Sequence, residues 1–70
     1  MTFIIKDTYT NEVVQITSSK NQALNWCGKQ AQELNYGMFR TWEDPEKGTF
    51  CDVGPKTYVI KMISKLNNPN

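Results

Sequence analysis

The feature of this sequence that most constrains its fold is one amphipathic helical pattern in an otherwise strand-rich chain. Ser19 precedes Gln22 by three residues, the spacing of a capping box, in which each side chain can satisfy the other residue's free backbone N–H. Apolar residues then recur at the i, i+3, i+4, i+7 and i+8 spacing of one helix face: Ala23, Leu24, Cys27, Ala31 and Leu34. Asn35 and Gly37 follow as residues that often end helices. The pattern predicts a helix over residues 20–34 that packs on a sheet through this stripe.

Five runs rich in β-branched and aromatic residues surround the predicted helix. They cover residues 2–6, 12–17, 36–42, 49–53 and 57–63. The strongest turn signal is Asp44-Pro45-Glu46-Lys47-Gly48, where proline suits the first turn position and glycine supplies the left-handed residue. The last run is apolar on both faces, which favours either a central place in the sheet or an edge that meets a partner.

The order ββαβββ predicts an α+β fold, with one helix packed on an antiparallel sheet of four to five strands. A chain of 70 residues makes one domain with a thin core. We expect this domain to span residues 1–66 and a flexible tail to span residues 67–70. Because one helix covers only one face of a sheet, the other face is expected to be bare.

Composition and charge leave the class of partner open. Eight basic and seven acidic residues give a net charge of +1, so global electrostatics favours no partner class. No run approaches the ~20 apolar residues of a membrane span, and the N-terminus lacks the pattern of a signal peptide. We therefore expect a cytoplasmic protein with no membrane partner. Cys27 and Cys51 are expected to be reduced there, with a disulfide between them as the alternative.

Residues that commonly perform catalysis are scarce in this chain. It has no histidine and only two cysteines, so zinc would need carboxylates at a spacing that is not present. Its four glycines are scattered, and no glycine-rich phosphate loop is found. Cys27 falls on the apolar stripe and is expected in the core, while Cys51 has no basic neighbour to lower its pKa. The sequence predicts a protein that is not an enzyme and uses no metal or cofactor.

Two groups of candidate binding residues lie outside the predicted core. Glu43, Asp44 and Glu46 cluster in a turn and form either a solvated loop with ordinary pKa values or an acidic knob that docks on a basic partner. Trp26 lies at the boundary of the apolar stripe. It either covers the edge of the core or anchors a partner, since tryptophan is frequent among interface hot spots.

The third predicted strand supplies a further group of candidates. At alternating positions along one of its faces it carries Tyr36, Arg40 and Trp42. If Phe39 points to the core, these three side chains lie on the open sheet face, near Tyr58 or Lys61 of the last strand. Otherwise the aromatic residues fill the core. Aromatic and basic residues on a bare sheet suit either a protein interface or stacking on nucleic-acid bases.

Part of the sequence resembles a known group of inhibitors. Phe3-Ile4-Ile5-Lys6-Asp7, then Gln15-Ile16, then the serine-capped helix with Gln22-Ala23, resemble the N-terminal half of small phage-encoded anti-CRISPR proteins directed at type I surveillance complexes. The resemblance covers residues 3–42, with a spacing that differs by one residue at the helix start, and the second half of the chain has no counterpart in it. It implies a non-enzymatic protein that occupies a site on a host complex, in competition there with nucleic acid. No functional residue is carried over from it.

Two classes of function follow from these patterns. The leading prediction is a protein-binding inhibitor or regulator with a protein or ribonucleoprotein partner, acting in the host cytoplasm if it is phage-encoded. The alternative is a small nucleic-acid-binding module that uses Arg40, Lys56, Lys61 and stacked aromatic residues. The protein is expected to be a monomer or a small homo-oligomer, and in the latter case the last strand would pair with its copy.

Overall fold

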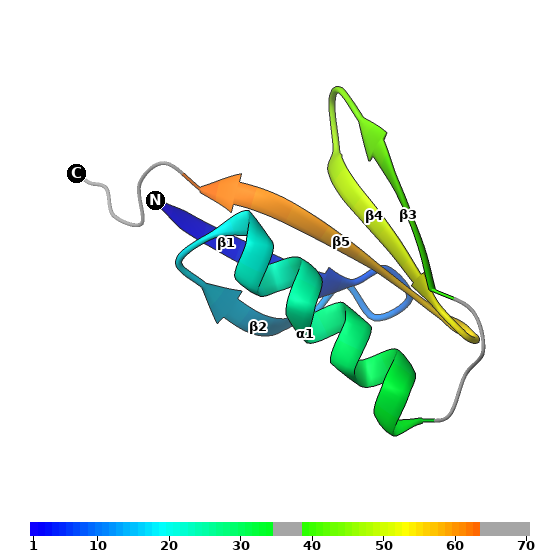
Figure 1. Ribbon diagram of the computed structural model, residues 1–70. Coiled ribbons are helices and arrows are strands. Elements are labelled where there is room, and N and C mark those ends of the chain that lie inside the picture. The colour runs from blue at the N-terminus through cyan, green and yellow to red at the C-terminus, as the bar shows by residue number, and fades with distance from the viewer. Residues whose placement is uncertain (35–38, 64–70) are drawn as a thin grey trace.

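The structure, a computed structural model, describes residues 1–34 and 39–63 and shows one helix lying along one face of a five-stranded antiparallel sheet (Figure 1). The elements are β1 (Thr2–Asp7), β2 (Val13–Thr17), α1 (Lys20–Glu33), β3 (Phe39–Asp44), β4 (Gly48–Val53) and β5 (Lys56–Ile63). The predicted α+β fold and its ββαβββ order are confirmed. The first part of the predicted third strand, residues 36–38, and the predicted tail lie outside the described residues.

The last strand lies inside the sheet, between the first and the fourth. The strand order is β2-β1-β5-β4-β3, with every neighbouring pair antiparallel. Ile60 of β5 is in register with Ile5 on one side and with Thr49 on the other. Both edges of β5 are therefore occupied by backbone hydrogen bonds. Of the two alternatives for this strand, the central place is confirmed, and the edge that pairs with a second copy is wrong. The edges of the sheet are β2 and β3.

The start of α1 follows the predicted cap in part. Ser19 has an extended backbone, with φ −149°, and its side-chain oxygen accepts from the backbone N–H of Gln22 at 3.1 Å. The Gln22 side chain accepts from the backbone N–H of Ser18 at 3.1 Å and from its hydroxyl at 2.9 Å, not from the N–H of Ser19. The reciprocal half of the capping box is thus shifted by one residue, because the Ser18 hydroxyl offers Gln22 a second donor.

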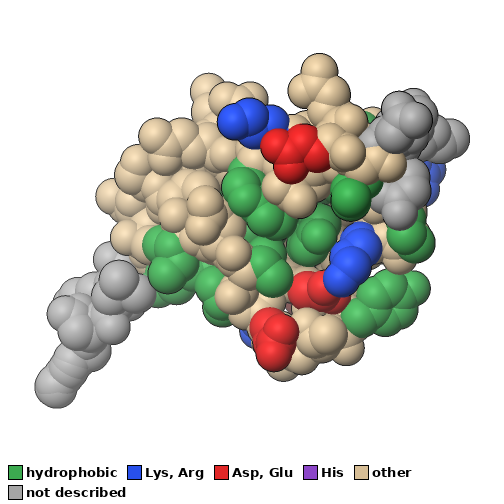
Figure 2. Space-filling model, turned by 90° about the horizontal axis from the view of Figure 1, so that it is seen from below, with side chains coloured by type: hydrophobic (Ala, Val, Ile, Leu, Met, Phe, Trp, Pro, Cys, Tyr) green, Lys and Arg blue, Asp and Glu red, His purple; other side chains and the backbone are tan. Residues whose placement is uncertain are grey.

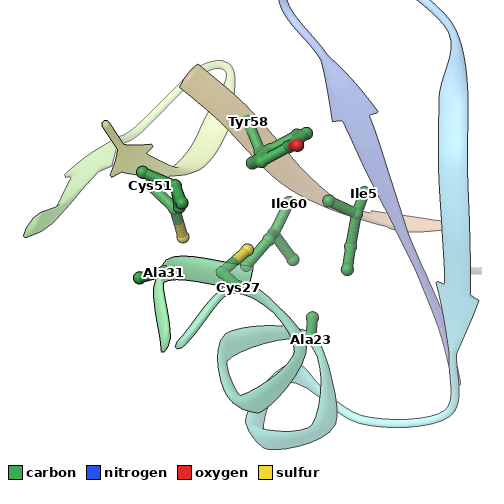
Figure 3. Close-up of a cluster of buried hydrophobic side chains, with 8 residues drawn as sticks. Ile5, Ala23, Cys27, Ala31, Cys51, Tyr58 and Ile60 are labelled. Carbon is green, nitrogen blue, oxygen red and sulfur yellow. The ribbon is translucent and has the colours of Figure 1, made fainter. Parts of the chain in front are cut away.

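Three small residues bring α1 close to the sheet. Ala23, Cys27 and Ala31 are buried, whereas Leu34, predicted as the last residue of the stripe, is the exposed C-cap. The core beneath them consists of Ile5, Cys51, Val53, Tyr58 and Ile60, most of which are drawn in Figure 3. Short side chains on the helix leave room for these larger ones from the strands, so the layers interlock at close packing.

The two cysteines lie opposite one another across this core. Cys27 comes from α1 and Cys51 from β4, and both are buried free thiols (Figure 3). A hydrogen bond with Cys51 and burial raise the pKa of the Cys27 thiol above its usual value. A thiol with a raised pKa is a poor nucleophile at neutral pH, so this arrangement fits a packing role for Cys27.

The turn between β3 and β4 follows the sequence prediction. Asp44 accepts from the backbone N–H groups of Glu46 at 2.8 Å and Lys47 at 2.9 Å. Gly48 closes the turn with φ 115°, a conformation that side chains rarely permit. A Cβ atom at this position would collide with the carbonyl oxygen of Ile60 on β5. Glycine is therefore required here both by the backbone angle and by the neighbouring strand.

A buried carboxylate fixes the loop between β1 and β2. Asp7 is 3% exposed, and one of its oxygens accepts from the backbone N–H groups of Tyr9 at 2.8 Å and Thr10 at 3.3 Å. The other oxygen forms an ion pair with Lys56 at 3.0 Å, at the start of β5. The Lys56 hydrogen bond, followed by that from Tyr9, lowers the pKa of Asp7 below its ordinary value.

This lowered pKa predicts an acid-sensitive contribution to stability. The contribution is fully present above the unfolded-state value of about 3.9 and is lost as the pH falls through the lower folded-state value. We expect the Asp7→Asn variant to be less stable than the wild type at pH 7 and to lose less stability between pH 7 and pH 3. Urea unfolding at both pH values measures this. Glu12→Gln, at an exposed carboxyl in the same loop, serves as the control. An equal acid response of Asp7→Asn and the wild type would refute the assignment.

Candidate functional site

The sheet face opposite α1, called the open face here, carries the candidate site. Residues paired across neighbouring strands point to the same side of a sheet, and successive residues alternate between sides. One row across the open face runs through all five strands and consists of Val13, Lys6, Val59, Phe50 and Trp42. Among the described residues, no helix covers this row. The row therefore consists of four apolar side chains and Lys6. Val13 and Trp42 at its two ends are exposed, while Val59 in its middle is buried.

An aromatic stack with an arginine lies at the β3 end of this row. The rings of Trp42 and Phe50 are stacked, with centroids 5.4 Å apart and planes 6° from parallel. The Arg40 guanidinium lies 5.7 Å from the centroid of the Trp42 ring, within the range of a cation–π interaction. Arg40 also donates to Asp52 at 2.9 Å, and Asp52 accepts from the Thr57 hydroxyl at 2.8 Å. We call Arg40, Trp42 and Phe50 the aromatic stack.

The carboxylate of Asp52, which is paired with Arg40 on the neighbouring strand β4, holds the arginine of the aromatic stack in position. The Arg40 hydrogen bond, followed by that of Thr57, lowers the pKa of Asp52 below its usual value, so this group stays ionised at neutral pH. Trp42 nevertheless remains 42% exposed. The stack therefore presents a large ring to solvent in a fixed orientation.

The position of Phe39 shows which side chains of β3 point toward the helix and which lie on the open face. Phe39 lies on the helix side, where its ring is next to Gly28 of α1, so Arg40 and Trp42 lie on the open face. Tyr58 was expected near them but is buried beneath α1, because β4 separates β3 from β5 and Tyr58 points to the helix side. Lys61 does lie on the open face. Tyr36 lies outside the described residues.

A pocket next to the aromatic stack is lined by three lysines. Its volume is about 340 Å³, and its lining consists of Lys6, Thr8, Asn11, Lys47, Phe50, Val59 and Lys61. None of the three lysines forms an ion pair within the described part of the chain, and no carboxylate belongs to this lining. Phe50 and Val59 give the pocket an apolar wall. We call it the lysine pocket.

The three acidic candidates do not form one surface. Glu43 lies on the helix side, where it accepts from Lys20 at 2.7 Å and from the Thr49 hydroxyl at 3.1 Å. Asp44 caps the turn, and Glu46 is the one of these three acidic residues whose side chain is exposed and forms no hydrogen bond with another described residue. The Lys20 hydrogen bond lowers the pKa of Glu43, and the turn N–H groups lower that of Asp44. The expectation of ordinary pKa values was wrong for these two residues, because they are hydrogen-bonded within the fold.

Trp26 contacts the core and also borders a groove. Its ring meets Tyr58 edge to face, with centroids 5.3 Å apart and planes at 80°. The same residue lines a groove of about 680 Å³ between α1 and β2, with mostly polar side chains from both elements: Gln15, Ile16, Thr17, Gln22, Asn25, Lys29 and Gln32. Trp26 therefore covers the edge of the core, which was the first of its two predicted roles. Part of the residue also faces this groove.

Charges of both signs are mixed on the surface shown in Figure 2, where hydrophobic side chains gather in the middle and acidic and basic groups lie close to them. Most of the ion pairs formed by the described residues join neighbouring elements of the fold. Across residues 1–34 and 39–63, no three histidine, cysteine or acidic side chains come together as a metal site. In the same part of the chain, α1 has neither the length nor the apolar character needed to span a membrane.

Sequence reasoning missed three residues of the open face: Phe50, Lys6 and Lys47. A signal for Phe50 existed, because Trp42 and Phe50 are equally distant from the middle of the Asp44–Gly48 turn and a hairpin places such residues opposite each other. No comparable signal existed for Lys6, whose neighbour Val59 is far away in the sequence. No protein-family model, curated protein or solved structure matches this chain.

Proposed function

We propose that this chain is a non-enzymatic binding protein, an inhibitor or regulator that docks on a protein or ribonucleoprotein partner through its open face. The main support is the aromatic stack, in which an exposed tryptophan contacts both the Phe50 ring and the guanidinium of Arg40. Tryptophan and arginine dominate interface hot spots. Because Arg40 is already held by Asp52, little side-chain freedom is lost when a partner binds.

The class of partner follows from the resemblance of residues 3–42 to small phage-encoded inhibitors. On that basis we propose a type I CRISPR surveillance complex, or a related host defence complex, as the partner and the host cytoplasm as the place of action. The open face offers such a complex a mainly apolar row that includes Lys6 and has Lys47 and Lys61 beside it, which suits an acidic protein surface.

Replacing Trp42 tests this proposal directly. We expect Trp42→Ser to weaken binding to a purified type I surveillance complex about 30-fold or more, since hot-spot truncations cost about 2 kcal/mol or more. The matched control is Phe39→Ser, because Phe39 lies on the same edge strand, on the other face, with nearly the same exposure of 41%. Titration calorimetry gives the affinities, and circular dichroism verifies the folding of each variant.

The outcomes separate the docking face from general damage. Binding that survives in Phe39→Ser and fails in Trp42→Ser supports docking through the open face. If Phe39→Ser does not fold, Met62→Ser replaces it, since Met62 is an exposed apolar residue on the helix side. Equal losses in Trp42→Ser and the folded control, or full binding by Trp42→Ser, would rule out this face. Absence of any binding by the wild type would reject the proposed partner.

A second candidate function is a small nucleic-acid-binding module. The lysine pocket favours it, because three lysines that form no ion pair with any described residue lie next to stacked aromatic rings on the same face. Proteins that bind single strands combine a positively charged groove with aromatic residues on which bases stack. Three basic residues were predicted to bind nucleic acid. Two of them have carboxylate partners, Arg40 with Asp52 and Lys56 with Asp7 on the helix side. The third, Lys61, lines the pocket.

A further inference from the structure

The lysine pocket concentrates positive charge that has no ion-pair partner among residues 1–34 and 39–63. Lys6 comes from β1, Lys61 from β5 and Lys47 from the turn between β3 and β4. Three other basic residues, Lys20, Arg40 and Lys56, each have a carboxylate partner at 2.7 to 3.0 Å. Like charges that share one concave surface repel one another, and a bound anion removes this repulsion. The pocket thus offers a site for an anion that the fold itself does not fill.

The remaining lining indicates which kind of anion fits. One face of the Phe50 ring is covered by Trp42 from β3, and the buried Val59 of β5 is in register with Phe50 on the other side. Phe50 and Val59 together form the apolar wall of the pocket, and a planar base placed in the pocket would lie against this wall. Thr8 and Asn11 add neutral polar groups at the edge. A volume of about 340 Å³ has room for a small ligand and excludes a duplex.

We propose that the lysine pocket binds a nucleotide, with its phosphate near Lys6, Lys47 and Lys61 and its base against the apolar wall formed by Phe50 and Val59. Lysine ammonium groups are common point-charge ligands of phosphate, and bases stack on aromatic side chains irrespective of sequence. The nucleotide is either free or one unit of a single strand. This inference rests on the second candidate function and does not depend on docking by Trp42 to a protein partner.

Titrations with defined probes test the site. Wild-type protein is titrated with adenosine monophosphate, adenosine, inorganic phosphate and an eight-residue oligothymidylate at low salt, and backbone amide NMR shifts are followed. We expect adenosine monophosphate to bind at least ten-fold more tightly than adenosine or phosphate alone, because only it uses both halves of the pocket. We also expect its affinity to fall as salt is added.

Charge variants connect binding to the pocket. The double variant Lys47→Gln with Lys61→Gln changes two exposed side chains and is expected to lose at least ten-fold in affinity for adenosine monophosphate. The control is Lys29→Gln, at an exposed lysine of α1 outside this pocket, which is expected to stay within two-fold of the wild type. Oligothymidylate that binds ten-fold more tightly than the mononucleotide, with the same loss in the double variant, identifies a single strand as the source. Similar affinities for oligothymidylate and adenosine monophosphate identify a free nucleotide as the source.

Three results would overturn the nucleotide site. They are the absence of shifts with the mononucleotide and with the oligonucleotide, an equal loss in the Lys29→Gln control, and binding of a polyglutamate peptide as tight as that of adenosine monophosphate. The last result would assign the pocket to acidic peptides. Since the protein-docking test reads binding to a purified complex through Trp42, it can fail while nucleotide binding succeeds, and the reverse also holds.

Discussion

Replacing Ile5 by alanine is expected to lower the free energy of unfolding of this protein by about 2–5 kcal/mol, a large part of its stability. Ile5 is 0% exposed, lies in register with Ile60 and packs under α1 (Figure 3). An isoleucine-to-alanine change in a core costs about 2–5 kcal/mol, because the lost contacts leave a cavity that closes only in part. At about 0.05–0.15 kcal/mol per residue, the whole chain of 70 residues has about 3.5–10 kcal/mol of stability.

Urea unfolding, followed by tryptophan fluorescence, measures the loss. A second readout is available from Cys27 and Cys51, which are buried and free, so a thiol reagent reaches them only when the protein opens. The matched control is Ile16→Ala, the same change at a side chain that is 60% exposed on edge strand β2. We expect this control to stay within about 1 kcal/mol of the wild type. Similar losses in the two variants would show that Ile5 is not a core residue.

The second large effect is expected at the turn that leads into β4. Gly48→Ala forces a side chain into a conformation with φ 115° and against the carbonyl oxygen of Ile60, a backbone atom that cannot rotate away. Each such strain costs about 1–3 kcal/mol, and here the two occur together. We expect a loss of at least about 2 kcal/mol in the free energy of unfolding, measured by urea unfolding.

The same substitution at another glycine provides a control of opposite sign. Gly28 lies inside α1, and a Cβ atom there would be 3.8 Å from the Phe39 ring, an ordinary van der Waals contact. Because alanine favours a helix over glycine by up to about 1 kcal/mol, Gly28→Ala is expected to raise the stability. If Gly48→Ala were as stable as the wild type, this result would contradict the close contact described between Gly48 and the backbone of β5.

Local signals predicted most of the secondary structure. The cap at Ser19 and the apolar stripe predicted α1, and Asp44-Pro45 with Gly48 predicted the hairpin, because these features depend on residues only a few positions apart. The place of β5 between β1 and β4 was one of two alternatives left open. Strand order is decided by contacts between distant segments, and such contacts leave no periodic signal in one sequence.

The candidate site was predicted only in part, and the reason is the same. The pattern placed Arg40 and Trp42 on one side of a strand, yet only the packing of Phe39 against Gly28 decided which side faces away from the helix. The acidic residues were grouped because they are close in sequence. Side chains alternate between the two faces along β3, so Glu43 lies on the helix side, where it forms an ion pair with Lys20. Adjacency in the chain is a poor guide to adjacency on a sheet, since neighbouring residues point to opposite faces.

The sequence by itself determined a small α+β chain with one capped helix, a tight glycine turn and no histidine for catalysis. These properties depend on local backbone preferences and on composition. Only the tertiary structure decided that Phe50 stacks on Trp42 and that Lys6, Lys47 and Lys61 border one pocket. Residues from four strands and a turn meet there through the register of hydrogen bonds across β1, β5, β4 and β3. That register is fixed by burial of the opposite face under α1.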